Sequence, residues 1–197
     1  GNIGLRPMGD VDLLVKPADL TKALAVLRTL GYVAAYPFEI ESVRHLSQHM
    51  PPLSKRGGVT IELHWTIVNP RYNVHFDDSD LDQLWSRATP IKIDGVQVLM
   101  LSPMDLLWHL CLHASVQHRF DGIGLRGFWD MALVIHRYGD EIDWEQFTRR
   151  VNQWGIANGV HLALQLTEEW TGIVIPTPVM RALMPATPDA ATIGWVR

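Results

Sequence analysis

The sequence predicts an α+β protein in two parts, an α/β half over residues 1–101 and an all-helical half over residues 102–197. In the first half, short apolar runs between Gly- and Pro-containing turns alternate with one strong helix pattern. From Ser102 onward, apolar residues recur at helical spacing and the strand patterns stop. We expect the domain boundary at this change of composition.

Composition narrows the class of protein. The chain has 197 residues, 47% of them hydrophobic and 19% charged, with a net charge of −4. These values exclude a disordered chain and argue against a general nucleic-acid-binding surface, which is normally basic. The single Cys111 fits a reducing compartment, and no apolar run approaches the roughly 20 residues that a membrane span needs. We therefore expect a cytoplasmic protein with no membrane partner.

The first elements follow from turn residues and apolar spacing. Val11–Val15 is an apolar run between turn segments, and it predicts a buried strand. A helix is expected over 18–30, because Pro17 suits a first helical turn and Gly31 suits the position after a last one. A returning strand is expected over 32–36.

A hairpin is predicted over 43–65, with its turn at 55–58 (Lys-Arg-Gly-Gly). Its second arm alternates: Thr60, Glu62 and His64 fall on one face, and the apolar residues fall on the other, namely Val59, Ile61, Leu63 and Trp65. Two prolines at 51 and 52 make the first arm an edge or bulged strand.

Further along, a short helix is expected over 80–87 and a second hairpin over 91–98, where Asp94-Gly95 favours a type I′ turn. Ser102 followed by Pro103 predicts the start of a helix that runs to about residue 118. Four more helices are expected, over 125–138, 144–154, 160–170 and 179–184.

Asp10 and Asp12 are the sharpest chemical signal in the chain. Side chains alternate along a strand, so these two carboxylates point to the same face. Like charges this close repel each other unless a cation neutralises them, and Mg²⁺ binds carboxylate and phosphate oxygens. The alternative is that Asp10 caps a turn and Asp12 lies on a solvated strand face.

Glu62 supplies a third carboxylate, on the polar face of its expected strand. If that strand is a neighbour of the strand that carries Asp12, the three carboxylates form a two-metal site of the kind used in phosphoryl transfer. His64 shares this face and is expected to reach the same site. The alternative for both residues is a solvated, outward-facing position.

These segments resemble a known family. The motifs are residues 5–15 (Leu-Arg-Pro-Met-Gly-Asp-Val-Asp-Leu-Leu-Val), a helix that ends in Gly31-Tyr32, residues 61–65 (Ile-Glu-Leu-His-Trp), and a Ser-Pro-x-Asp-Leu-Leu-x-x-Leu-x-x-His run within residues 99–113. Over about residues 3–135 the chain resembles an uncharacterised nucleotidyltransferase family of the DNA polymerase β-type nucleotidyltransferase superfamily.

The resemblance implies a nucleotidyltransferase-like mixed β-sheet flanked by helices and followed by a helical domain. It implies that Asp10, Asp12 and Glu62 bind two Mg²⁺ ions and are catalytic, with a nucleotidyl group moving from a nucleoside triphosphate to an acceptor hydroxyl. Arg6 is expected to pair with a phosphate and, with His64, to bind substrate. The acceptor is left open among small molecules, proteins and RNA, as are the base preference and the oligomeric state.

The superfamily also has a glycine-containing phosphate-binding turn before the paired aspartates, and only nine residues precede Asp10. We therefore expect the domain over residues 1–101 to be N-terminally incomplete. The alternative is a non-catalytic binding or regulatory module that keeps the fold and lacks this turn.

Several other residue groups have weaker functional interpretations. His109 and His113 are spaced for a zinc site of a metal hydrolase, but no H-E-x-x-H motif accompanies them. A phosphate-contacting patch is an alternative for His118, Arg119 and Arg126, and the role of Asp130 is left open. The sequence contains no P-loop, no Rossmann glycine motif and no G-x-S-x-G motif, so those classes are excluded.

Overall fold

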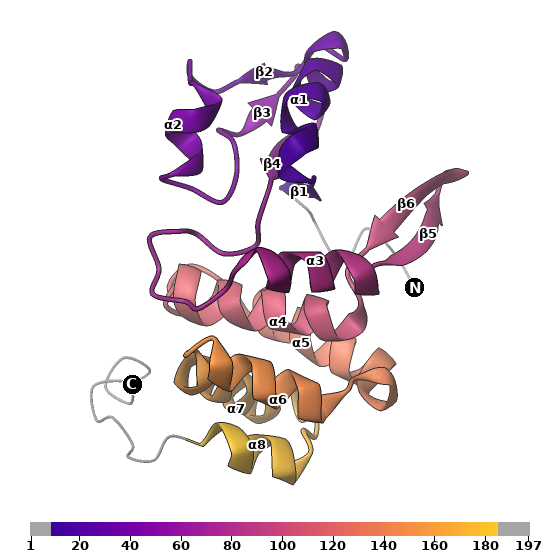
Figure 1. Cartoon of the computed structure of the whole chain (residues 1–197). Coiled ribbons are helices and arrows are strands. Elements are labelled where there is room, and N and C mark those ends of the chain that lie inside the picture. Colours follow the sequence, from indigo (N-terminus) through magenta and orange to yellow (C-terminus); the bar gives the residue numbers. More distant parts are fainter. Residues whose placement is uncertain (1–8, 185–197) are drawn as a thin grey trace. The chain divides into compact units, whose positions relative to one another are not determined.

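The computed structural model describes residues 9–184, so Arg6 lies outside the described residues. The chain divides into two compact units, residues 1–72 and residues 73–197 (Figure 1). Each unit is described by itself below.

The first unit contains a four-stranded mixed sheet with the order β1-β4-β3-β2. Strand β1 is parallel to β4, which is antiparallel to β3, and β3 is antiparallel to β2. The strands are β1 (Asp10–Leu14), β2 (Val33–Ala34), β3 (Leu53–Ser54) and β4 (Thr60–His64), and the helices are α1 (Leu20–Thr29) and α2 (Ile40–Arg44). The predicted mixed sheet with flanking helices is thus confirmed.

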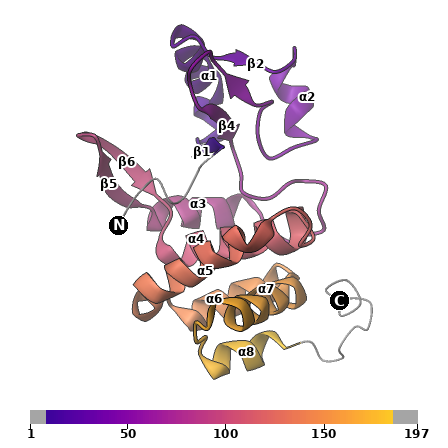
Figure 2. The ribbon, with the colours of Figure 1, turned by 180° about the vertical axis from the view of Figure 1, so that it is seen from behind.

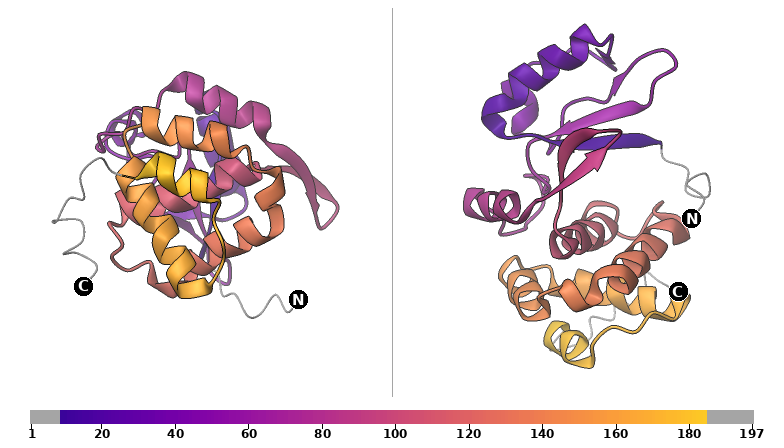
Figure 3. Two further views of the ribbon diagram at one scale, coloured as in Figure 1. Left: turned by 90° about the horizontal axis from the view of Figure 1, so that it is seen from below. Right: turned by 90° about the vertical axis from the view of Figure 1, so that its right-hand side faces the viewer.

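Helix α1 packs along one face of this sheet and forms the core of the first unit (Figure 3, right). A short 3₁₀ turn over Pro17–Asp19 precedes the helix, where the fixed φ of proline favours a helical start. The buried cluster contains Leu20, Leu24, Leu27, Tyr32, Met50, Leu53, Ile61, Leu63 and Trp65. Because β4 alternates, burying Ile61 and Leu63 on this face turns Glu62 and His64 to the opposite face.

The predicted first hairpin is only partly correct. Its second arm is β4, and Gly57 (φ +72) lies in the turn. The first arm was expected to begin at residue 43, but residues 40–44 form α2 and the ladder covers only Leu53–Ser54. Pro51 and Pro52 have no N–H to donate, so regular pairing begins after them. The strand expected over 32–36 is reduced to the two residues of β2, because β3, the strand that pairs with it, is only two residues long.

The described residues of the second unit form six α-helices, a short π-helix, a 3₁₀ turn and one hairpin (Figure 2). The hairpin joins β5 (Thr89–Ile93) to β6 (Val96–Met100), and Asp94 (φ 49) and Gly95 (φ 80) form its turn as predicted. The helices are α3 (Asp78–Arg87), α4 (Pro103–Leu112), α5 (Gly124–Tyr138), α6 (Trp144–Gln153), α7 (Ala157–Thr171) and α8 (Thr177–Leu183). The helix predicted to reach residue 118 changes to a π-helix over His113–Gln117.

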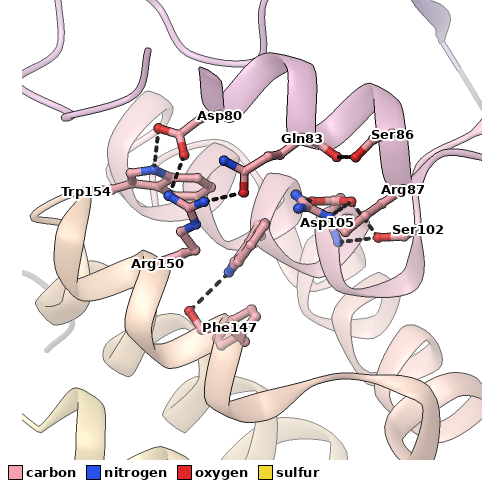
Figure 4. A network of polar contacts seen from close by, with 10 residues as sticks. Asp80, Gln83, Ser86, Arg87, Ser102, Asp105, Phe147, Arg150 and Trp154 are labelled. Atoms are coloured by element: carbon pink, nitrogen blue, oxygen red, sulfur yellow. Dashed lines mark hydrogen bonds and ion pairs between the residues drawn. The ribbon is translucent and has the colours of Figure 1, made fainter. Parts of the chain in front are cut away.

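Two ion pairs hold α3 against α4 and α6 (Figure 4). Arg87 donates from Nε and Nη2 to the two oxygens of Asp105, at 3.0 and 2.7 Å, and the Asp105 side chain is fully buried. Asp80 accepts from the indole Nε1 of Trp154 at 3.0 Å and pairs with Arg150 at 3.0 Å. A buried carboxylate needs such partners to offset its lost hydration.

These contacts place α3 with the helical elements, and the compact second unit therefore begins at Asn73. The change of composition near Ser102 lies inside this unit. A domain boundary between residues 101 and 102 stays a prediction.

No helix among residues 9–184 is both long and apolar enough to cross a membrane.

Candidate functional site

The parallel register of β1 and β4 brings the two acidic segments together. Asp12 is the ladder partner of Glu62, Asp10 of Thr60, and Leu14 of His64. In a parallel ladder, partner residues point to the same face. The face opposite the α1 core therefore carries Asp10 and Asp12 from β1, and Glu62 and His64 from β4.

His64 lies between two of the carboxylates. Its Nε2 is 3.3 Å from Oδ1 of Asp12 and 3.6 Å from Oε2 of Glu62. One ligand atom from each of these three side chains lies within 4.8 Å of the others. His64 is 9% exposed, so its position is buried rather than solvated, whereas the Asp12 side chain is 56% exposed.

His49 lies beside this cluster, and sequence reasoning missed it. It forms an isolated antiparallel bridge with His64, and the two rings lie 4.8 Å apart, centroid to centroid. Its Nε2 is 3.7 Å from Oε2 of Glu62. The segment around His49 is irregular, so no strand periodicity marks its face. The available signal was a lone histidine just before Pro51 in the arm expected to pair with β4.

Charge dominates this cluster. Burial acts to lower the pKa of His64, but the adjacent carboxylates of Asp12 and Glu62 outweigh it and raise that pKa to about 9. The pKa of Glu62 is lowered, chiefly by the neighbouring imidazole of His64 and also by His49, against the opposing effects of burial and Asp12. In the metal-free protein, the imidazolium of His64 therefore supplies the positive charge that two carboxylates require.

The chemistry of these donors also fits a metal ion. Nε2 of His64 is buried and makes no hydrogen bond of good alignment, although both carboxylates are near it. A nitrogen and two carboxylate oxygens that converge in this way are common divalent-metal ligands. Asp12, Glu62 and His64 are the one group of three or more such side chains found within residues 9–184.

Asp10 is exposed and lies on the same strand face, but it is not a member of that group. The structure therefore brings together Asp12, Glu62 and His64 and leaves Asp10 at the margin. Asp10 remains available to a ligand that approaches this face from solvent. That any of the four residues binds a metal stays a prediction.

Three other histidines, His109, His113 and His118, lie near one another in the second unit. The ring centroids of His109 and His113 lie 5.9 Å apart, and those of His113 and His118 lie 4.3 Å apart, with their Nε2 atoms 3.1 Å from each other. Among the described residues, these three histidines do not bring their ligand atoms together into a group that could hold a metal ion. Cys111 is fully buried, and burial raises the pKa of its thiol, which argues against a nucleophilic role. The roles of Arg119, Arg126 and Asp130 stay open.

One comparison with known protein families produced a match. A family model described as an uncharacterised nucleotidyltransferase matches residues 1–172. Comparison with curated proteins and with solved structures produced no match. The family match spans both of the strands that carry the acidic residues and most of the helical unit. The chain therefore belongs to this uncharacterised nucleotidyltransferase family.

Proposed function

We propose that the protein is a divalent-metal-dependent nucleotidyltransferase, which moves a nucleotidyl group from a nucleoside triphosphate to an acceptor hydroxyl. Family membership supports nucleotidyl transfer and implies a triphosphate substrate. The observation that carries the proposal is the pairing of Asp12 with Glu62 in the β1–β4 ladder, with Asp10 on the same face. Three carboxylates from two adjacent strands supply oxygen ligands for two metal ions, and such a pair of ions stabilises the attacking and leaving oxygens in phosphoryl transfer.

Each residue has a proposed role. Asp10, Asp12 and Glu62 hold two Mg²⁺ ions, which neutralise the charge of the triphosphate and stabilise the charge that develops during transfer. Glu62 is ionised at neutral pH because its pKa is lowered, so it is able to accept a proton from the acceptor hydroxyl. His64 contacts the substrate beside Glu62, and Arg6 pairs with a phosphate.

The acceptor hydroxyl belongs to a small molecule, a protein or an RNA, and these classes are to be separated by assay. We propose a cytoplasmic location, from the single buried Cys111 and the absence of an apolar membrane-spanning run.

Calorimetry with Mg²⁺ and a non-hydrolysable triphosphate tests the proposal. The native chain is compared with a double variant, Asp10→Asn plus Asp12→Asn. The matched control is Asp82→Asn plus Asp94→Asn, which removes the same charge from two exposed positions of the second unit. We expect triphosphate binding to be lost in the first double variant and kept in the second.

Equal binding by all three proteins overturns the metal role of the aspartates. Metal-dependent triphosphate binding without release of pyrophosphate, in the presence of candidate acceptors of all three classes, supports the non-catalytic binding module instead. Release of pyrophosphate that depends on Asp12 supports the enzyme.

A further inference from the structure

We propose that His49 and His64 join Asp12 and Glu62 in a mixed imidazole–carboxylate metal site, which selects a transition-metal ion such as Mn²⁺ or Zn²⁺ over Mg²⁺. This inference rests on the proposed function, because the same cluster holds one of its two metal positions. It adds two nitrogen ligands and changes the identity of the ion at that position. The second ion, which arrives with the triphosphate, remains Mg²⁺ near Asp10.

The first argument comes from ligand chemistry. Mg²⁺ takes oxygen ligands in an octahedral shell and keeps several water molecules. Imidazole nitrogen suits Zn²⁺, Fe²⁺ and other first-row transition ions, and carboxylate with imidazole also suits Mn²⁺. A site that binds only Mg²⁺ needs oxygen ligands and does not need a buried imidazole directed at its carboxylates.

The second argument is the spacing of the ligand atoms. Two ligands that each lie about 2.0–2.1 Å from a shared ion are about 2.8–3.0 Å apart in octahedral geometry and about 3.3–3.4 Å apart in tetrahedral geometry. Nε2 of His64 lies 3.3 Å from Asp12 and 3.6 Å from Glu62, and Nε2 of His49 lies 3.7 Å from the same oxygen of Glu62. The ligand atoms of Asp12, Glu62 and His64 already lie within 4.8 Å of one another, whereas His49 lies outside that group and its side chain has to rotate toward the shared ion to join it.

The third argument is the orientation of His49. Its Nδ1 lies 2.7 Å from the backbone oxygen of Met50, which only accepts, so Nδ1 carries the proton. In the neutral ring the lone pair is then on Nε2, which faces Glu62. Histidines that ligate metals commonly donate their other ring nitrogen to a backbone carbonyl in this way, because that bond fixes the tautomer and the ring orientation.

The fourth argument is the buried Nε2 of His64, which makes no well-aligned hydrogen bond. A buried polar atom left in this state costs free energy unless a partner arrives. A metal ion between His64, Asp12 and Glu62 satisfies the nitrogen and both carboxylates together. The competing explanation is a permanent salt bridge, in which the imidazolium of His64 is the counter-ion and no metal is bound.

Metal titration of the full chain separates these explanations. Protein stripped with a chelator and exchanged into chelator-free buffer is titrated with MnCl₂, ZnCl₂ or MgCl₂ by calorimetry, and bound Mn²⁺ is also measured by electron paramagnetic resonance. We expect one tight site, with Mn²⁺ and Zn²⁺ bound at least about 10-fold more tightly than Mg²⁺. His64→Gln and His49→Gln are each expected to weaken Mn²⁺ and Zn²⁺ binding by about 10- to 100-fold and to leave weak Mg²⁺ binding unchanged.

His45→Gln is the matched control, because His45 is an exposed histidine of the same unit. Circular dichroism checks folding, and if His64→Gln is unfolded, His49→Gln decides the outcome by itself. Mg²⁺ affinity equal to that of Mn²⁺ overturns the proposed metal selectivity. Mn²⁺ and Zn²⁺ affinities that are unchanged in the tested histidine variants, or no metal binding at all, overturn the histidine ligands in favour of the salt bridge.

The experiments distinguish failure of the proposed nucleotidyl transfer from failure of the proposed mixed metal site. Histidine-dependent Mn²⁺ or Zn²⁺ binding without any triphosphate binding overturns nucleotidyl transfer and keeps the mixed site. Mg²⁺-dependent triphosphate binding that is unchanged in the His49 and His64 variants, without histidine-dependent Mn²⁺ or Zn²⁺ binding, overturns the mixed site and keeps nucleotidyl transfer.

Discussion

Asp12 and Glu62 are direct partners in the parallel ladder between β1 and β4, and Nε2 of His64 lies within 3.6 Å of an oxygen from each. Two carboxylates on adjacent parallel strands repel each other, and a cation between them stabilises the arrangement. The structure supplies one internal cation, protonated His64, and a geometry that also suits a metal ion. The predictions below follow from that pairing and from the ion pairs of the second unit.

In metal-free protein, His64 is expected to titrate near pH 9 rather than near 6.5. Its charge faces the carboxylates of Asp12 and Glu62 and the ring of His49. NMR titration of the histidine ring protons in excess chelator measures this value, and His64→Gln identifies the resonance. Asp12→Asn should lower the pKa by removing one attracting charge. An unshifted His64 in the native chain contradicts the proposed charge balance.

The same shift predicts how stability depends on pH. Because the pKa of His64 is higher in the folded state, its contribution is complete below pH 6.5 and is lost as the pH rises through about 9. A pKa that rises from 6.5 to about 9 corresponds to a contribution on the order of 3 kcal/mol. Urea unfolding at pH 6 and pH 9.5 in excess chelator measures it, and His64→Gln should show a smaller difference between the two values of pH.

Asp10 and Asp12 are expected to be unequal. Asp12 lies in the cluster with Glu62 and His64, whereas Asp10 lies outside it. Without nucleotide, Asp12→Asn should weaken binding of the tight metal ion by about 10-fold or more, which is about 1.4 kcal/mol. Asp10→Asn should have little effect until triphosphate is added. Metal titrations with and without a non-hydrolysable triphosphate test this, and identical effects of the two variants would exclude the assignment.

Arg87→Ala is expected to destabilise the second unit by about 3–5 kcal/mol, because it leaves the fully buried Asp105 without its charged partner. Arg149→Ala is the control: Arg149 pairs with Glu145 across one helical turn at 3.7 Å, and both side chains are exposed. Such exposed pairs contribute about 0.3–0.5 kcal/mol. Chemical denaturation of the two variants measures the contrast, and equal losses would argue against a structural role for the buried pair.

Cys111 is expected to resist alkylation in the native protein. Its side chain is fully buried in α4, and burial raises the pKa of its thiol, so little thiolate is present at neutral pH. Iodoacetamide labelling followed by mass spectrometry should report modification only when denaturant unfolds the helical unit. Fast labelling of the native chain would contradict the packing of α4 against α5.

Much of the fold was predictable, because its strongest signals are local. The helix pattern that became α1, the Asp94-Gly95 turn and the Ser102 cap each depend on residues a few positions apart, and each prediction is confirmed. The short strands β2 and β3 and the helix α2 were predicted poorly. Prolines at 51 and 52 interrupt the pattern there, and the pairing of these residues depends on partners elsewhere in the chain.

For the candidate site, the sequence by itself determined that Asp10 and Asp12 share one strand face, and that Glu62 and His64 share another. This follows from the two-residue period of a β-strand. Only the tertiary structure placed the β1 residues Asp10 and Asp12 on the same side of the sheet as the β4 residues Glu62 and His64. The parallel pairing of β1 with β4 is a contact between distant segments, and its register depends on how α1 packs against Ile61 and Leu63. The same packing brings His49, from an irregular segment without periodicity, to the carboxylate of Glu62.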